Sequence, residues 1–362
     1  MIILKEDIQK VETLKKEGVI FCDNLQEQLE ELCEIKNPIL RDDKEKMAEL
    51  KKTFVFENKD KFVYFYIPER RSCHKILLEN DYFELRTARN KNLITLEEQN
   101  KFREAKVVFA GLSVGSNMLR LCALQGGPKN INIADMDVLG LSNLNRILAG
   151  VHDLGKKKTE VISEYLYEVD PYLQINLFSD GINEKNVEDF IKINGEVADV
   201  IVDEVDDIKS KIALRQMADK YKKPLISVAD NADGVIIEVE RYDQDFTFEM
   251  FVQRLEILKK FGNPQEMTIE AKAKAITHFI GIENIDTDML ISVSEVGKTL
   301  YSWPQLGGAA VLSGVVGSYL IRKIVNGSNI KSGVYLFSLK DLFDLENEEE
   351  KKKRENILKF FN

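Results

Sequence analysis

The regular alternation of apolar and amphipathic segments from residue 106 onward is the feature that most restricts how this chain can fold. Short apolar segments typical of buried strands are separated by helical segments such as KSKIALRQMADKY. Strands joined through helices pair in parallel, with helices covering both faces of the sheet. The sequence therefore predicts an α/β fold with a doubly wound, mainly parallel sheet. The expected strands are KVVFAG, NINIAD, LQINLFSD, ADVIVDEVDD and PLISVAD.

The N-terminal part of the chain has a different pattern, which predicts a small α+β region. Residues 1–52 are polar with helical periodicity, and TFVFEN and KFVYFYIP are typical of two strands joined by a turn at Lys59 and Asp60. Such a region either clamps a substrate or supports a dimer. The expected organisation is an α+β region at 1–85, an α/β domain at 86–345 with a crossover region at 243–303, and a charged helix at 346–362.

Composition narrows the class of protein. A net charge of −10 argues against a general nucleic-acid binder, because such proteins need a basic surface to neutralise phosphates. The four cysteines form no C-x-x-C pair, which predicts a reducing compartment and no zinc. The N-terminus lacks the apolar core of a signal peptide, and the run at 306–321 is too short to span a bilayer and predicts a buried helix. We therefore expect a cytoplasmic protein without a membrane or nucleic-acid partner.

A glycine turn follows the first strand of the predicted sheet. Gly111 opens the sequence GLSVGS before a helix, and Asp135 ends the next strand 24 residues later. This order matches Rossmann-like dinucleotide-binding domains, in which the helix N-terminus meets phosphate and the acid meets a ribose hydroxyl. Serines replace two glycines of the usual pattern, so an NAD(P)-binding oxidoreductase and a turn without any ligand both stay open. The turn residues proposed to line the nucleotide are Gly111, Ser113, Val114 and Gly115.

A dense set of acids and donors follows the second strand, in IADMDVLGLSNLNR. Lysines then appear in DLGKKKTE, and acids end a later strand in VDEVDD. Cations and a carboxylate that converge on one edge suit a triphosphate with Mg²⁺, because cations bind phosphates and a carboxylate binds the metal. Alternatively, Asp137 caps a turn, Asp207 caps the next helix, and Lys156 and Lys157 are solvated. The candidates are Asp135, Asp137, Ser142, Asn143, Asn145, Arg146, Lys158, Asp206 and Asp207.

The motifs AKVVFAGLSVGS, ADMDVLGLSNLNR, LGKKKTE and VIVDEVDD together resemble the adenylating domain of the ThiF/MoeB/ubiquitin-activating family. The resemblance runs from about residue 86 to 340, and the GLSVGS turn is similar to that of a bacterial subgroup. It implies that Asp135 binds ribose and that Asp206 positions Mg²⁺. It further implies that the phosphates of ATP are held by Asn143, Arg146 and Lys158.

The segment LRTARNKNLIT resembles the R-Y-x-R-Q segment of the same family. There an arginine crosses to the ATP of the partner subunit, which maps Arg89 onto the crossing arginine and Arg86 onto the first arginine. The resemblance therefore implies a homodimer with Arg89 donated across the interface. Two surface arginines beside Glu84 are the alternative interpretation.

Many family members transfer the activated carboxyl group to a cysteine, but this chain has no cysteine after Cys122. We therefore expect an ATP- and Mg²⁺-dependent adenylyltransferase that acts on a carboxylate, such as the C-terminus of a small ubiquitin-like or sulfur-carrier protein, without its own thioester cysteine. A non-catalytic partner of an activating enzyme and an NAD(P)-binding oxidoreductase are the alternatives. Phe and Met residues in 243–303 either grip a substrate or serve as buried packing.

Overall fold

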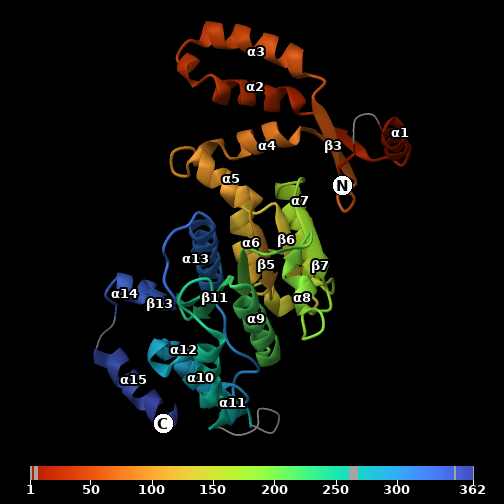
Figure 1. The fold of residues 1–362 in the computed structure, drawn as a ribbon. Coiled ribbons are helices and arrows are strands. Elements are labelled where there is room, and N and C mark those ends of the chain that lie inside the picture. The colour runs from red at the N-terminus through yellow and green to blue at the C-terminus, as the bar shows by residue number, and fades with distance from the viewer. Residues whose placement is uncertain (1, 4–6, 261–267, 346–347, 362) are drawn as a thin grey trace. The chain divides into compact units, whose positions relative to one another are not determined.

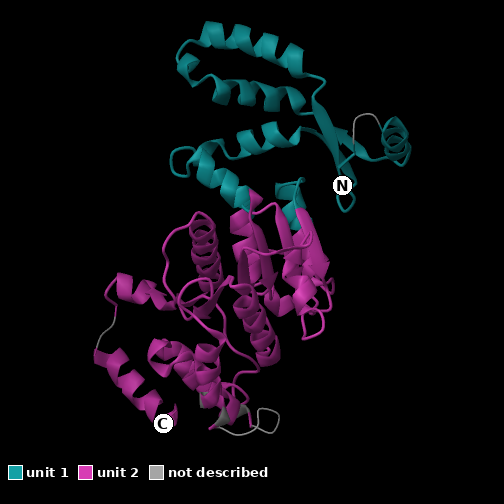
Figure 2. Ribbon diagram, viewed as in Figure 1, with its two compact units in different colours: residues 1–103, 123–127, 164–173 teal, residues 104–122, 128–163, 174–362 magenta. Residues whose placement is uncertain are grey.

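The computed structural model describes residues 2–3, 7–260, 268–345 and 348–361. Its chain divides into two compact units, coloured separately in Figure 2. The first unit comprises residues 1–103, 123–127 and 164–173. The second comprises residues 104–122, 128–163 and 174–362. The sequence boundary expected near residue 85 lies at the end of helix α4, inside the first unit.

The first unit is built on a four-stranded sheet with the order β1-β3-β4-β2. Strands β3 and β4 form an antiparallel hairpin, and β2 pairs in parallel with β4. A buried aliphatic cluster formed by α2, α3 and β4 packs beside the sheet. The elements are β1 (Ile2–Ile3), α1 (Ile8–Lys16), β2 (Ile20–Cys22), α2 (Leu25–Lys36), η1 (Pro38–Leu40), α3 (Lys44–Asn58), β3 (Phe62–Ile67), β4 (Ser72–Leu77), α4 (Glu79–Arg86), η2 (Ala88–Asn90) and α5 (Leu96–Glu104).

The prediction of a strand at TFVFEN is wrong, because these residues form the last turns of α3. Asp43 caps the start of this helix by accepting a hydrogen bond from the Lys46 backbone N–H at 3.1 Å. Phe54 and Val55 then pack against Leu29 of α2 and its neighbours, as a helical face requires. The local β-propensity of the hexapeptide is thus outweighed by a helix that is already nucleated upstream and by its packing partner. The strand predicted at KFVYFYIP is confirmed as β3.

The second unit contains a seven-stranded sheet with the order β13-β12-β11-β10-β5-β6-β7 (Figure 1). Its five strands from β11 to β7 pair in parallel, whereas β12 is antiparallel to both β11 and β13. All five expected strands are present, and the predicted α/β fold with a mainly parallel sheet is confirmed. The strands are β5 (Lys106–Ala110), β6 (Asn130–Ala134), β7 (Gln174–Phe178), β10 (Val200–Asp203), β11 (Pro224–Asn231), β12 (Gly234–Arg241) and β13 (Gly333–Ser338), with a separate hairpin of β8 (Lys192–Ile193) and β9 (Glu196–Val197).

Helices cover both faces of this sheet. Helices α8 and α9 contribute to one buried cluster with β5 and β10, and α13 packs on β11 and β12 beside α6. Close packing of α6 and α13 requires glycine at position 314, because a Cβ there would lie 2.7 Å from the backbone carbonyl carbon of Asn117. The helices are α6 (Gly115–Leu124), η3 (Leu141–Asn143), η4 (Val151–Asp153), α7 (Lys158–Val169), α8 (Val187–Phe190), α9 (Ile208–Tyr221), α10 (Phe248–Lys259), α11 (Ile269–Ile280), η5 (Ile282–Asn284), α12 (Thr287–Glu295), α13 (Gly307–Val325), α14 (Leu339–Leu342) and α15 (Glu348–Phe361).

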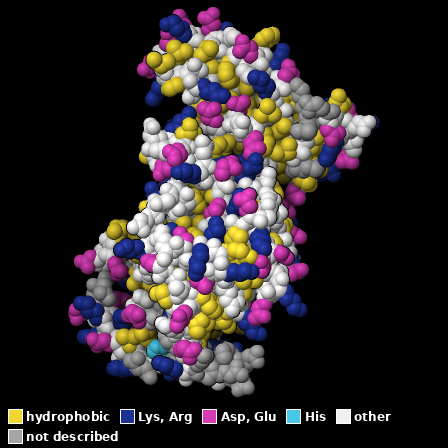
Figure 3. Space-filling view, in the orientation of Figure 1, with side chains coloured by type: hydrophobic (Ala, Val, Ile, Leu, Met, Phe, Trp, Pro, Cys, Tyr) yellow, Lys and Arg dark blue, Asp and Glu magenta, His cyan; other side chains and the backbone are white. Residues whose placement is uncertain are grey.

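Helix α13 is the one helix among the described residues that is long and apolar enough to cross a membrane. Half of its most apolar stretch is buried inside the protein, where small residues such as Ala310 and Gly314 approach the sheet and α6. Its other face exposes Val311, Val315 and Tyr319. The expectation of a buried helix therefore holds for one face of α13. On the face of the molecule shown in Figure 3, acidic and basic side chains are interspersed.

Candidate functional site

The carboxyl ends of four parallel strands meet at one edge of the large sheet. Strands β5, β6, β10 and β11 are neighbours in the sheet, and a loop follows each of them at this edge. Ligands of open α/β sheets bind at this edge, in the crevice outside the strand ends. The candidate residues that follow these strands in the sequence therefore lie at the same edge of the sheet.

The glycine turn brings the backbone of the β5–α6 loop close to the end of β10. Gly111 has a φ of +91°, and a Cβ at this position would lie 2.2 Å from the Glu204 carbonyl oxygen. Neither the conformation nor the space is open to another residue. Val114 is buried in this turn, Gly115 begins α6, and Ser116 is buried in the first turn of that helix. The turn thus presents the N-terminus of α6 at the crevice, a position where backbone N–H groups bind phosphate.

Asp135 is held by two backbone N–H groups. Its Oδ2 accepts a hydrogen bond from Leu112 of the glycine turn at 2.8 Å, and its Oδ1 accepts one from Asp137 at 2.9 Å. The carboxylate is nearly buried, with 9% of the side chain exposed. Because each carboxylate oxygen can accept more than one hydrogen bond, Asp135 can still receive a ribose hydroxyl. The turn and the acid predicted to bind the same nucleotide are therefore linked directly.

Lys158 is the first residue of α7, and it points toward the two aspartates of the IADMD segment. Its Nζ lies 2.8 Å from Asp137 Oδ2 and 3.7 Å from Asp135 Oδ2. The side chain of Lys158 is 7% exposed, whereas that of Asp137 is 63% exposed. Asp137 is therefore more than a turn cap, because it pairs with the lysine predicted to bind phosphate. The neighbouring Lys157 donates to the Met136 carbonyl, outside this ion pair.

Arg146 joins the SNLNR segment to the glycine turn. Its Nε donates to Ser113 Oγ at 2.9 Å, and its Nη1 donates to Asn145 Oδ1 at 2.9 Å and to the Ser142 carbonyl at 3.2 Å. Its Nη2 makes no hydrogen bond with the part of the chain that the structure describes. Burial lowers the pKa of the guanidinium, and the charges of Asp230 and Asp206 oppose this effect. Arg146 thus stands as an oriented cation at the crevice.

The asparagines of the SNLNR segment have structural partners. The Asn143 side-chain oxygen accepts a hydrogen bond from Gly140 N–H at 2.9 Å, which closes the η3 turn. Asn145 donates to the Gln305 carbonyl at 2.7 Å, just before α13. Ser142 contributes its carbonyl rather than its hydroxyl to Arg146. These three residues therefore shape the loop that carries Arg146, and their predicted contacts with phosphate stay predictions.

Asp206 and Asp207 follow β10 but differ in their surroundings. Asp207 caps α9, because its Oδ2 accepts hydrogen bonds from Ser210 N–H at 2.8 Å and Ser210 Oγ at 3.0 Å. The cap considered in the sequence analysis is therefore present. Asp206 is exposed and has no hydrogen-bond or ion-pair partner within the described ranges. Its charge nevertheless acts on Arg146, which places the two side chains in one electrostatic environment.

Two acids at this edge are absent from the sequence-based candidates. Glu204 follows β10, and its Oε1 accepts a hydrogen bond from Val228 N–H at 2.7 Å. Burial raises the pKa of Glu204 well above its usual value. Asp230 lies near the end of β11 and acts electrostatically on both Arg146 and Glu204. The sequence contained a signal for Asp230, because PLISVAD was predicted as a strand and an acid at its carboxyl end belongs to the same edge.

Arg89 lies in the η2 turn of the first unit, and Arg86 ends α4 in the same unit. Arg86 is tied down within that unit: its Nη1 donates to the Ala123 carbonyl and its Nη2 lies 3.0 Å from Asp170 Oδ2. Arg103 also pairs with Asp170, at 2.5 Å. Arg86 is therefore a structural ion-pair residue. The role of Arg89 across a dimer stays a prediction.

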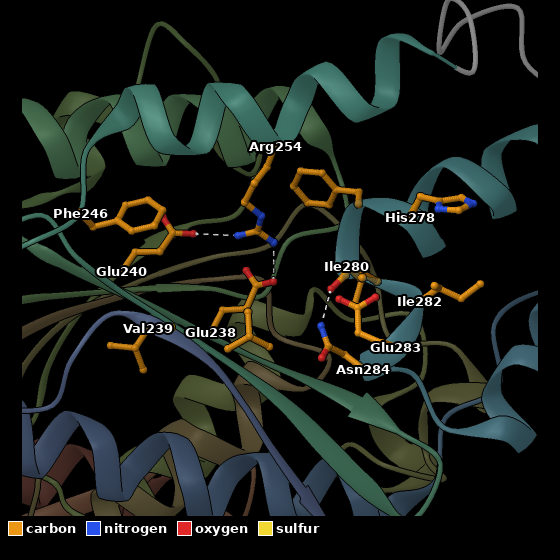
Figure 4. A pocket seen from close by; sticks show the side chains of 14 residues that line it. Glu238, Val239, Glu240, Phe246, Arg254, His278, Ile280, Ile282, Glu283 and Asn284 are labelled. Carbon is orange, nitrogen blue, oxygen red and sulfur yellow. Dashed lines mark hydrogen bonds and ion pairs between the residues drawn. The ribbon is translucent and has the colours of Figure 1, made fainter.

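The crossover region lines a pocket of about 480 Å³ on the second unit. Figure 4 shows Arg254 of α10 between two acids of β12, with Nη2 at 2.8 Å from Glu238 Oε1 and Nη1 at 3.9 Å from Glu240 Oε1. The Arg254 guanidinium also lies 4.9 Å from the centroid of the Phe279 ring. Phe251 of the same region is fully buried. For Phe251, packing is therefore the correct interpretation.

The sequence pattern of the ThiF family matches residues 87–340, which is more than half of the chain. The chain belongs to the ThiF family. This confirms the resemblance inferred from the glycine turn, the SNLNR segment and the VDEVDD segment. The matched range takes in every residue that the sequence predicted at the nucleotide site, including Arg89.

Known ThiF-like relatives differ in function. An uncharacterized protein of Mycobacterium tuberculosis is 30% identical over 74% of this chain and 36% of its own length. A tRNA threonylcarbamoyladenosine dehydratase of Saccharomyces cerevisiae is 26% identical over 44% of this chain and 38% of its own. A probable molybdopterin-synthase adenylyltransferase of Gracilaria tenuistipitata is 30% identical over 31% of each chain. The chain thus spans well under two thirds of the length of these relatives.

A solved structure has a similar fold. The structure of PaaA superimposes on 72% of this chain and 77% of its own with a TM-score of 0.50 and 15% sequence identity. At this identity the likeness concerns the fold alone.

Proposed function

We propose that this ThiF-family protein is an ATP- and Mg²⁺-dependent adenylyltransferase that activates a carboxylate. The observation that carries the proposal is the placement of two cations, Arg146 and Lys158, at the strand edge that also bears the glycine turn and Asp135. An NAD site has no need of this pair, whereas the phosphates of ATP carry enough charge to use both cations. The name of the Gracilaria relative, an adenylyltransferase, points in the same direction.

In this proposal the residues act by position and charge. The Asp135 carboxylate receives a ribose hydroxyl, and the N-terminus of α6 faces phosphate. Lys158 gives up its ion pair with the exposed Asp137 and binds a phosphate oxygen instead, while Nη2 of Arg146 donates a hydrogen bond to a second phosphate oxygen. The substrate carboxylate attacks the α-phosphorus, the bond to the bridging oxygen breaks, and pyrophosphate leaves with the electron pair. No protein nucleophile is needed, so catalysis comes from orientation and charge neutralisation.

Asp206 fits the role of Mg²⁺ ligand in this scheme. Its carboxylate is exposed at the crevice and without a protein partner in the described parts of the chain, and carboxylate oxygens are ligands that Mg²⁺ prefers. The metal would neutralise charge on the phosphates when bound. Asp206 would hold the metal close to Arg146, because the two side chains already interact electrostatically.

The activated carboxylate in our proposal is the C-terminus of a small ubiquitin-like or sulfur-carrier protein, in the cytoplasm. In this proposal the chain does not supply the thiol of a thioester itself, which is supported by the burial of three of its cysteines: Cys122 is 1% exposed inside α6, where burial raises its pKa, and Cys33 and Cys73 are fully buried. The acyl-adenylate is therefore passed to an external nucleophile.

Replacement of Lys158 tests the nucleotide site directly. In Lys158→Ala we expect the affinity for Mg-ATP to fall by about 10- to 100-fold, because a charged hydrogen bond to phosphate is lost. Isothermal titration with Mg-ATP, NAD and NADP measures this. Lys157→Ala is the matched control, since its Nζ bonds only a backbone carbonyl, and it should bind as the wild type does. Binding of NAD(P) in place of Mg-ATP would support an oxidoreductase, and no binding of any of the three would support a non-catalytic partner.

We also propose a homodimer in which Arg89 of one protomer reaches the ATP of the other. The outer face of α13 supports an interface between copies: Val311, Val315 and Tyr319 recur every four residues and are 43%, 49% and 49% exposed. Contiguous exposed apolar residues of this kind mark interaction surfaces. An isologous dimer would place two such stripes against each other.

Complementation between variants tests the crossing arginine. Arg89→Ala and Asp206→Ala should each lack pyrophosphate exchange, yet a heterodimer of the two, isolated with two different tags, should recover about half the wild-type rate. In this heterodimer one site is intact, because it combines Asp206 of one protomer with Arg89 of the other. The second site lacks both residues. If Arg89 acted within its own protomer, both sites would be defective and the heterodimer would stay inactive. Full activity of Arg89→Ala alone would also contradict the proposal.

A further inference from the structure

Asp230 is a half-buried carboxylate at the crevice whose hydrogen-bond donors are all neutral. Its Oδ1 accepts from Ser313 Oγ of α13 at 3.1 Å, and its Oδ2 accepts from Gln305 Nε2 at a longer 3.3 Å. Gln305 is in turn held by Asn145 through its carbonyl at 2.7 Å. Asp230 therefore lies between the start of α13 and the loop that carries Arg146, at the carboxyl end of β11.

The ionisable groups that interact electrostatically with Asp230 are Arg146 and Glu204, and burial raises the pKa of Glu204 well above its usual value. Burial raises the pKa of Asp230 to about 6, although Ser313 and Arg146 act in the opposite direction. The Asp230 carboxylate is thus ionised at neutral pH, but no cation in the described part of the chain is paired with its negative charge. Arg146 lies beyond ion-pair distance, and its bonds go to Ser113, Ser142 and Asn145.

The other acids at this strand edge have defined partners or a proposed task, or, like Asp233 in the turn after β11, are exposed to solvent. Asp135 and Asp137 pair with Lys158, and Asp207 caps α9. Asp203 and Glu204 are held by a buried arginine and a backbone N–H respectively. Asp206 is exposed and suits a metal ion. Asp230 is thus the partly desolvated carboxylate at this edge that is left to bind a cation from outside.

We propose that Asp230 forms an ammonium-binding subsite beside Arg146, which receives a primary amine as the acceptor of the activated acyl group. The inference rests on the proposed adenylating function and names the class of nucleophile that completes it. Arg146 is expected at the phosphates, so an amine bound at Asp230 lies next to the position where the acyl phosphate bond forms. The loops that follow β5, β6, β10 and β11 contain no cysteine, so an amine takes the place of a thiol acceptor in this proposal.

The transfer balances without another reactant. The ammonium group donates a proton to the Asp230 carboxylate as its nitrogen lone pair attacks the acyl carbon. A C–N bond forms, the bond between the acyl carbon and the phosphate oxygen breaks, and AMP leaves with the electron pair. The second proton of the nitrogen goes to solvent, which yields an amide, AMP and protonated Asp230. General-base assistance of this kind contributes about 10²- to 10⁴-fold.

Two measurements test the subsite, each with Asp230→Asn and the matched control Asp233→Asn. Asp233 is an exposed acid in the turn after β11, so the control removes the same charge from the same loop. The first measurement is saturation-transfer NMR of ethylammonium against ethanol at pH 8, which needs no adenylation. The wild type and Asp233→Asn should bind ethylammonium, and Asp230→Asn should bind it about tenfold more weakly or worse.

The second measurement is AMP and amide formation from Mg-ATP, a glycine-terminated peptide and ethylamine, divided by the rate of ATP–pyrophosphate exchange. We expect this ratio to fall by about 100-fold in Asp230→Asn, and in the wild type to rise with pH through about 6 as Asp230 ionises. If ethylammonium binding depends on Asp230 but the protein catalyses no ATP–pyrophosphate exchange, the result would contradict the adenylating function and support the subsite. If ATP–pyrophosphate exchange occurs, but both variants bind ethylammonium equally and give equal ratios of amide formation to exchange, the subsite would be overturned. The adenylating function would be unaffected by that result.

Discussion

Asp206→Ala is expected to lose ATP–pyrophosphate exchange by about two to three orders of magnitude while the protein remains folded. The exposed carboxylate makes no contact within the described structure that its loss would break, and it acts on Arg146 at the crevice. Removing this carboxylate should therefore leave the packing unchanged, but the Mg²⁺ that neutralises the phosphates should lose its protein ligand. Exchange at saturating Mg-ATP, with rising Mg²⁺ concentrations, measures the effect.

Asp207→Ala provides the contrast, because the neighbouring acid has a structural partner. Loss of the cap on α9 should destabilise the protein by about 1 kcal/mol and lower the Tm by about 2–4 °C. Asp206→Ala should leave the Tm within about 2 °C of the wild type, since surface substitutions change stability by no more than about 0.5 kcal/mol. Wild-type exchange in Asp206→Ala would remove this residue from the proposed mechanism, and a large loss of Tm would mean that its role is structural.

Arg215→Met is expected to destabilise the fold by about 3–5 kcal/mol, which corresponds to a fall in Tm of about 6–20 °C. Arg215 of α9 is 2% exposed, with Nη1 at 2.5 Å from Asp203 Oδ2 and Nη2 at 2.9 Å from Glu240 Oε1. Its guanidinium also lies 4.3 Å from the centroid of the Phe251 ring. Removing it leaves two buried acids without their shared cation, and methionine restores volume but no charge.

The pH dependence identifies the cause of this destabilisation. Burial by itself favours protonated acids, and Lys211 with Arg215 holds the pKa of Asp203 below its usual value, whereas burial keeps that of Glu240 raised. Without Arg215 the pKa of Asp203 should rise above that of the unfolded chain, and the already raised pKa of Glu240 should rise further. The stability lost in Arg215→Met should therefore be largest at neutral pH and diminish as the pH falls toward 5.

Thermal unfolding at pH 7.5 and pH 5 measures both effects, with Lys209→Met as the control. Lys209 is exposed on the same helix, so this change removes the same charge and should alter stability by no more than about 0.5 kcal/mol. A loss in Arg215→Met that is equal at both pH values would point to packing against Phe251 as the main contribution. A Tm equal to that of the wild type would contradict the role of Arg215.

Local sequence rules worked best where one residue and its near neighbours set the structure. The sequence TLEEQ has the Thr-x-x-Glu pattern of a capping box, and the structure contains it: Glu98 N–H donates to Thr95 Oγ1 at 3.2 Å and Thr95 N–H donates to the Glu98 carboxylate at 2.9 Å. The glycine at position 111 is required by its φ and by the adjacent backbone, as a tight turn before a helix implies. The same rules failed at TFVFEN, where α2 packs against a helix that began at Lys44.

The candidate site shows the same division. The strands that precede Asp135 and Asp206 could be predicted from the sequence, because each is a single apolar segment followed by acids. The partners of Arg146 and Lys158 could not, since they depend on how loops after different strands fold at one edge. The position of Asp230 at a strand end could likewise be predicted, but its surroundings could not, since they come from Gln305 and Ser313, 75 and 83 residues further along the chain.

By itself the sequence determined the mainly parallel α/β fold, the ThiF family and the residues that gather at the carboxyl edge of the sheet. These follow from periodicity and from motifs, in which each signal lies within one strand, turn or helix. Only the tertiary structure decided which side chains are paired, buried or left to meet a ligand, such as the buried pairing of Arg215 with Glu240 and the uncompensated Asp230. Burial and ion pairing depend on segments distant in the chain, and their free energies arise only when those segments pack together.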